Sequence, residues 1–80
     1  MKLKLIDGDF NQNDTIDLLT LLYQVKIKFH EDKVKNTHNE EDIKMRERKI
    51  KLLQNSLAEA RNYIRQENST FRIDSEININ

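Results

Sequence analysis

The 80-residue chain has no cysteine, no proline and no tryptophan, and its only glycine is Gly8. Without cysteine the fold has neither disulfides nor a thiolate zinc site, so a small core has to hold by packing alone. Without proline or a further glycine, no strong helix breaker follows residue 8. These absences exclude a disulfide-rich secreted scaffold and favour long helices.

The chain also lacks a net charge, because 14 Lys and Arg residues balance 14 Asp and Glu residues. Domains that hold nucleic acid by bulk charge are usually strongly basic, so this balance argues against such a role. No apolar run approaches the roughly 20 residues of a membrane span, and MKLKLIDGDF lacks the apolar stretch of a signal peptide. We therefore expect a cytoplasmic protein without a membrane partner.

Two long segments have the apolar periodicity of helices. The first is predicted over residues 12–36, with Asn11 as its N-cap and Asp14 three residues later. The second is predicted over residues 39–67, with either Thr37 or Asn39 as its cap and three acidic residues in its first turn. A short polar turn joins them, so the sequence predicts a mainly α single domain, 1–80, built on an antiparallel helical hairpin.

The two ends of the chain alternate apolar and polar residues, which is the period of a strand. Residues 2–6, KLKLI, predict a short strand that ends at Gly8. Residues 71–79, FRIDSEINI, predict an extended tail or a second short strand, and a disordered tail is the alternative. Because both ends lie at the same end of a helical hairpin, the two segments are able to pair antiparallel.

Each predicted helix carries two apolar stripes rather than one. On the first helix the two stripes lie roughly 140° apart at 100° per residue. They consist of Leu18, Leu21, Leu22, Val25 and Phe29, and of Ile16, Leu19, Tyr23, Ile27 and Val34. The second helix has a stripe with strict coiled-coil spacing and a weaker one. They consist of Ile43, Arg46, Ile50, Leu53, Leu57, Ala60 and Ile64, and of Met45, Leu52 and Tyr63.

A single hairpin buries only one stripe per helix, so the other would form a large exposed apolar patch. We expect self-association into a homodimeric four-helix bundle, with higher or heterologous assembly and a monomer as the alternatives. The predicted dimer interface consists of Leu19, Tyr23, Ile27, Val34, Met45, Leu52 and Tyr63. The pattern itself leaves open which stripe faces the hairpin and which faces another chain.

In the expected register, each position i of the first helix faces a position of about 75 − i on the second helix. Arg46 then lies within the hairpin near Phe29 and Asp32. A structural ion pair or cation–π contact is favoured for it over an anion site.

The stretch GDFNQNDTIDLL resembles an EF-hand loop, and more closely the loop-helix half of a dockerin repeat. Asp9, Asn11 and Asn13 occupy the first three liganding positions. Asp14 stands where the loop needs glycine, however, and Thr20 stands where it needs a bidentate carboxylate. Turns and N-caps require the same residue types, so no calcium is predicted.

The expected tip of the hairpin gathers His30, Glu31, His38, Glu40, Glu41 and Asp42. They lack the HExxH and Glu-x-x-His spacings of metal sites, so a weak metal- or ligand-binding bundle is only an alternative function. No nucleophile–base arrangement and no glycine-rich phosphate loop is present. We therefore predict no enzyme, no catalytic residue and no cofactor.

The segments VKIKFHEDK and EEDIKMRERKIKLLQ resemble small uncharacterised bacterial helical-hairpin proteins. This resemblance implies the hairpin fold and no activity. The leading hypothesis is a non-enzymatic interaction module or small regulator that self-associates. The second is a nucleic-acid-associated regulator that contacts phosphate through Lys44, Arg48 and Lys51, which share one outer face of the second helix beside acidic neighbours.

Overall fold

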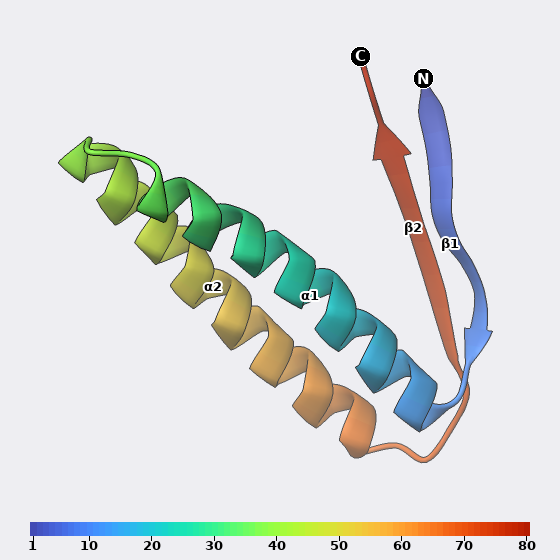
Figure 1. Ribbon diagram of the computed structural model, residues 1–80. Coiled ribbons are helices and arrows are strands. Elements are labelled where there is room, and N and C mark those ends of the chain that lie inside the picture. Colours follow the sequence, from blue (N-terminus) through green and yellow to red (C-terminus); the bar gives the residue numbers. More distant parts are fainter.

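The computed structural model describes all 80 residues and has the element order β-α-α-β (Figure 1). Its elements are β1 (Lys2–Phe10), α1 (Gln12–Lys35), α2 (Glu40–Arg65) and β2 (Phe71–Asn78). The two helices form an antiparallel hairpin, which confirms that prediction, and the two strands form an antiparallel ribbon. Hairpin and ribbon diverge from a common base as the two arms of a V, with overall dimensions of 46 × 33 × 13 Å.

Asparagine side chains cap both helices at their N-termini. The Asn11 side chain accepts a hydrogen bond from the Asp14 amide at 2.8 Å, as predicted. At α2 the cap is Asn39, whose side chain accepts from the Asp42 amide at 3.0 Å. Thr37, the other candidate, accepts from the Asn39 amide instead and shapes the turn. Each cap satisfies an amide that has no partner within its helix.

The first strand is longer than the sequence predicted, because it continues past residue 6 and through Gly8 to Phe10. The expectation that it stops at Gly8 is therefore wrong. Gly8 pairs with Ile73 in the ribbon and keeps a negative φ, so the residue acts as a strand position rather than a turn. Pairing with β2 supplies the hydrogen bonds that continue the strand, and it orders the C-terminal segment as a strand rather than a tail.

A β-bulge sets the two faces of the ribbon. The register shifts between Lys4 and Ile6, which leaves Leu5 without a partner. Because side chains alternate along a strand, the extra residue returns Leu3 to the face that carries Ile6. One face is consequently apolar; its members are Leu3, Ile6, Phe10, Phe71, Ile73 and Ile77.

The other face of the ribbon is charged. Lys4 forms an ion pair with Asp74 at 2.7 Å, and Arg72 pairs with Asp7 and, at 3.9 Å, with Asp9. These side chains are largely exposed, where single ion pairs contribute little stability. The observed register also places Asp7 directly opposite Asp74, and the Arg72 and Lys4 ion pairs offset the repulsion between these two carboxylates.

The core of the single chain is very small. The buried residues are Ile6, Thr15, His30, Leu57 and Ile64, and no large side chain is fully buried. Two of the five are polar. Most other residues between the helices are only half-buried.

The hairpin buries the stripe of α1 that was expected to lie outside. Its residues Leu19, Tyr23, Ile27 and Val34 are half-buried. Leu21, Val25 and Phe29, from the stripe expected inside, are exposed by 55 to 71%. Leu18 and Leu22 of that other stripe are half-buried as well, so the structure exposes only part of it.

Polar residues explain which side of α1 faces α2. Thr20 accepts hydrogen bonds from the Arg61 guanidinium at 2.8 and 3.2 Å. Gln12 donates to the Ile64 carbonyl at 3.0 Å, at the open C-terminal end of α2. Both lie on the same side of α1 as His30, which bonds to Arg46. A half-turn rotation of α1 would break all three contacts and leave buried polar groups unpaired.

Candidate functional site: an uncovered apolar face

The helical hairpin presents apolar side chains that nothing in the chain covers. On α1 these are Leu21, Val25 and Phe29, which are 60, 71 and 55% exposed. On α2 they are Met45, Leu52 and Tyr63, which are 39, 61 and 64% exposed. We call these six residues the uncovered face.

Three hollows run along the hairpin between the helices. The central hollow, of about 300 Å³, shares Lys26 and Leu53 with a smaller one of about 220 Å³ that Leu22 lines. It shares Ser56 with a hollow of about 460 Å³ near the base, which Tyr63 lines. The shared lining residues make these hollows one groove, which Leu22 lines from α1 and which Leu52 and Tyr63 line from α2.

The ribbon closes the base end of this groove. Phe71 and Ile73, from the apolar face of the ribbon, line the base hollow together with Leu19 and Tyr63. Further from the base, Ile77 is 42% exposed, because the two arms diverge. The apolar face of the ribbon and the uncovered face of the hairpin therefore border the same open space.

The predicted dimer residues divide into two groups. Met45, Leu52 and Tyr63 lie on the uncovered face, where an association surface needs them. The α1 residues of that prediction contribute to the inside of the hairpin instead; Leu19 and Tyr23, for example, line hollows from within. The contact with a second chain stays a prediction; the α1 residues exposed for such a contact are Leu21, Val25 and Phe29.

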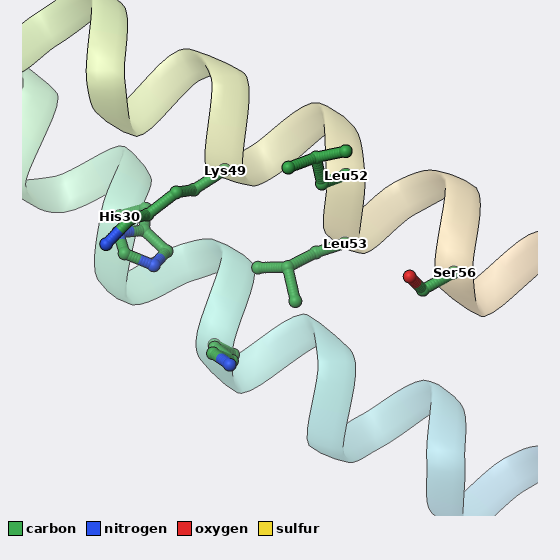
Figure 2. Close-up of a pocket in the computed structure, with 6 residues that line it drawn as sticks. His30, Lys49, Leu52, Leu53 and Ser56 are labelled. Carbon is green, nitrogen blue, oxygen red and sulfur yellow. The ribbon is translucent and has the colours of Figure 1, made fainter.

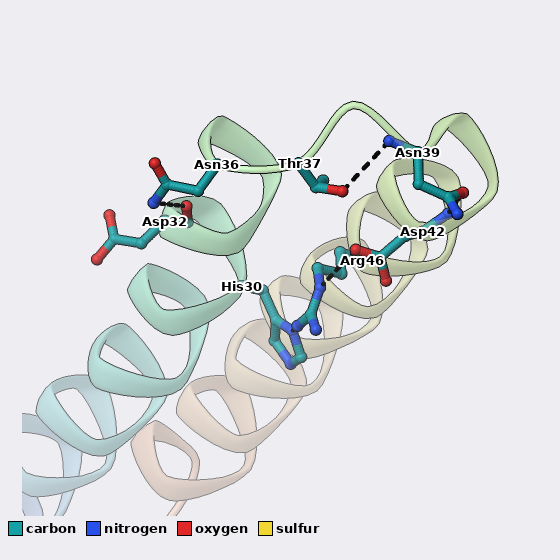
Figure 3. Close-up of polar contacts among 7 residues, drawn as sticks. All are labelled: His30, Asp32, Asn36, Thr37, Asn39, Asp42 and Arg46. Carbon is teal, nitrogen blue, oxygen red and sulfur yellow. Dashed lines mark hydrogen bonds and ion pairs between the residues drawn. The ribbon is translucent and has the colours of Figure 1, made fainter.

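Polar contacts near the hairpin tip hold Arg46 in place (Figure 3). Its Nη1 lies 3.1 Å from His30 Nδ1, and its Nε donates to Asp42 at 3.4 Å. The guanidinium also lies 6.0 Å from the ring centre of Phe29, as the expected register predicts. Asp32, the other expected neighbour, pairs with Lys28 on its own helix. These contacts agree with a structural role for Arg46.

His30 is only 8% exposed and its environment disfavours the charged imidazolium. Burial lowers the pKa of His30 below its usual value, and the positive charges of Arg46, Lys49 and Lys26 lower it further. The imidazole is therefore neutral at pH 7.

The candidate metal sites are not assembled by the fold. No three His, Asp or Glu side chains, at the tip or elsewhere, lie close enough to hold a metal ion. In the stretch that resembles a calcium loop, Asp9 is a strand residue that pairs with Arg72, and Asn11 caps α1. Strand pairing and capping account for the acidic and amide residues of this stretch.

Lys44, Arg48 and Lys51 are all exposed on α2. None of them forms an ion pair with a carboxylate, although Glu47 lies between them in the sequence. Their 4-3 spacing places them together on one outer face of α2, on which Arg48 lies one turn before Leu52 at the rim of the groove.

Sequence reasoning missed Lys26 and Lys49, which line the central hollow from opposite helices. Their positions sum to 75, so the expected hairpin register already places them opposite each other. The hairpin register, rather than any sequence motif, was the signal that could have identified this pair of lysines.

Neither helix is long and apolar enough to cross a membrane. No protein-family model, curated protein or solved structure matches the chain. The feature of the chain that points to a function is its uncovered face.

Proposed function

We propose that the chain is a non-enzymatic protein-interaction module that works as a homodimer through its uncovered face. The observation that carries this proposal is the excess surface of the single chain. Its accessible area is 6412 Å², whereas a compact monomer of 9.6 kDa exposes about 5,100 Å². The radius of gyration, 15.1 Å, likewise exceeds the roughly 11.6 Å of a compact 80-residue domain.

The excess of about 1,300 Å² per chain matches what a stable dimer buries. Standard interfaces remove about 800 Å² per partner, and obligate homodimers remove more. A second copy brings an identical apolar face, and a two-fold axis makes that face self-complementary. Covering this face also enlarges the core, which in one chain contains only five buried residues.

The arrangement that best covers these residues is a four-helix bundle. Two hairpins face each other across their grooves, and Val25, Leu52 and their neighbours interdigitate at coiled-coil spacing. The ribbons flank the bundle, with their apolar faces towards the partner. The charged face of each ribbon and the polar side of each hairpin stay in water.

Light scattering coupled to size exclusion, over a range of protein concentrations, tests this proposal. We expect a mass of two chains for the natural sequence. The double substitution Val25→Glu and Leu52→Glu places charges on the uncovered face and is expected to give a folded monomer or a much weaker dimer. The matched control, Gln24→Glu and Asn55→Glu, adds the same charges at exposed polar positions and keeps the dimer. A monomeric natural chain overturns the proposal.

A nucleic-acid-associated regulator is the second proposal. It is supported by the exposure of Lys44, Arg48 and Lys51, none of which has an ion-pair partner. The balanced net charge places it second. Binding of a DNA or RNA duplex that weakens steeply with salt and disappears when all three residues become Gln supports it. Binding that the triple variant retains contradicts it.

A further inference from the structure

We infer that the central hollow binds a small organic oxyanion, a carboxylate or a phosphate, that carries a short apolar group. The hollow lies midway along the hairpin and opens on the uncovered face (Figure 2). His30 stands at one end, Ser56 at the other, and Leu52 and Leu53 lie between them. Its volume of about 300 Å³ is at the lower end of the range for small-molecule sites.

The hydrogen-bonding state of His30 follows from its neighbour. The guanidinium of Arg46 carries only donors, so the short contact between Arg46 Nη1 and His30 Nδ1 requires Nδ1 to accept. In the neutral imidazole the proton then resides on Nε2. Nε2–H has no acceptor within the chain, and no buried side-chain nitrogen lacks a partner, so Nε2–H opens to solvent in the hollow. A side chain that is more than nine-tenths buried thus offers a free donor there.

The polar groups around this donor favour an anion. Lys26 and Lys49 line the hollow from opposite helices, and Ser56 adds a hydroxyl. Neither lysine forms an ion pair, and no carboxylate lines the hollow. The only nearby acid that contacts the cluster, Asp42, is engaged by Arg46 on the far side of the imidazole. Two cations, a fixed N–H donor and a hydroxyl that can donate, with no carboxylate among them, match an oxyanion.

The remaining lining is apolar and determines the rest of the ligand. Leu53 is half-buried at the floor, and Leu52 is 61% exposed at the rim. An alkyl or aryl group attached to the oxyanion covers these side chains, whereas an inorganic ion leaves them wet. A cation or an alcohol of the same size lacks the charge that the two lysines select.

This inference does not depend on self-association, because one chain supplies every lining residue. If two chains pair across the uncovered face, the partner closes the mouth of the hollow and encloses the ligand. Mass measurements test the dimer and ligand titrations test the hollow, so failure of either is recognised separately.

The experiment is a titration of the natural chain followed by nitrogen-15 NMR of the His30 imidazole and of the Leu52 and Leu53 amides. The probes are hexanoate, hexyl phosphate, acetate, 1-hexanol and hexylammonium. We expect hexanoate and hexyl phosphate to shift these signals with saturation, and their relative affinities identify the preferred head group. Acetate, hexanol and hexylammonium are expected to bind more weakly or not at all. Equal responses to hexanol and hexanoate overturn the inference, as does the absence of any saturable shift.

Substitutions locate the site. Lys26→Gln and Lys49→Gln each remove one charge while keeping the side-chain length, and each is expected to weaken hexanoate binding roughly fivefold. Lys51→Gln, on the polar side of α2, is the matched control and leaves the affinity unchanged. His30→Asn keeps an acceptor near the position of Nδ1 but removes the Nε2 donor, so the hairpin keeps its bond to Arg46 while binding weakens. Equal affinity in the Lys26 and Lys51 variants overturns the inference.

Discussion

The two apolar stripes of α1 are similar in composition, yet they have different surroundings in the structure. The inner stripe, which includes Leu19 and Tyr23, packs against α2, while the outer stripe, which includes Val25 and Phe29, lies in solvent. Hydrophobicity does not distinguish them. The difference comes from polar residues beside the inner stripe, which find partners only when that side faces α2. Apolar area drives the hairpin together, and polar complementarity selects its rotation.

The largest expected effect is a loss of stability that differs between two leucines of α2, one on the inner side of the hairpin and one on the outer side. Leu57 is buried between the helices and Leu52 lies on the uncovered face. Leu57→Ala is expected to lower the free energy of unfolding by about 2–4 kcal/mol, because it leaves a cavity in a very small core. Urea unfolding at a fixed protein concentration measures the loss.

The control, Leu52→Ala, is expected to cost less in a diluted monomer and to act mainly on the mass of the assembly. Equal losses for Leu52→Ala and Leu57→Ala in the monomer would show that the inner and outer sides are not energetically distinct.

A second, smaller effect tests whether polar contacts select the rotation of α1. Thr20→Val is nearly isosteric and removes the hydroxyl that accepts from Arg61. We expect a loss of about 1–2 kcal/mol, because the guanidinium stays half-buried without its acceptor. Urea unfolding measures this loss as well.

The double substitution Thr20→Val and Arg61→Leu removes both partners and is expected to recover much of the stability. A double variant that is as unstable as the sum of both single variants contradicts the proposed role of this pair.

The same comparison shows how much of the molecule was predictable from sequence. The two helices and the Asn11 cap follow from local patterns, since periodicity and capping are properties of neighbouring residues. The antiparallel pairing of the chain ends was predictable because a helical hairpin brings both ends together. The rotation of α1 was not predictable, because Thr20 and Arg61 are 41 residues apart and neither belongs to a motif. The extension of β1 through Gly8 was missed for a similar reason, as it depends on the pairing of Gly8 with Ile73. The two lysines of the central hollow, Lys26 and Lys49, could have been placed opposite each other from the hairpin register alone.

The smallest expected effect concerns the contact between His30 and Arg46 and is a dependence on pH. The pKa of His30 is lowered in the folded state by burial and by the charges of Arg46, Lys49 and Lys26. The unfolded chain therefore takes up the proton first, so stability is full above about pH 6.5 and falls as the pH drops below that value. Protonation would also place a donor on Nδ1 opposite the guanidinium donor of Arg46.

Urea midpoints at about pH 7.5 and 5.5 for the natural chain and for His30→Asn isolate this contribution, because every other titrating group is common to both. We expect the midpoint of the natural chain to fall further than that of the variant. His38→Asn is the control, since His38 is exposed in the turn and its replacement should leave the larger fall in place. Parallel profiles for the natural chain and His30→Asn would mean that the imidazole is not held neutral by the hairpin. The polar selection of the α1 rotation would then rest on Thr20 and Gln12 alone.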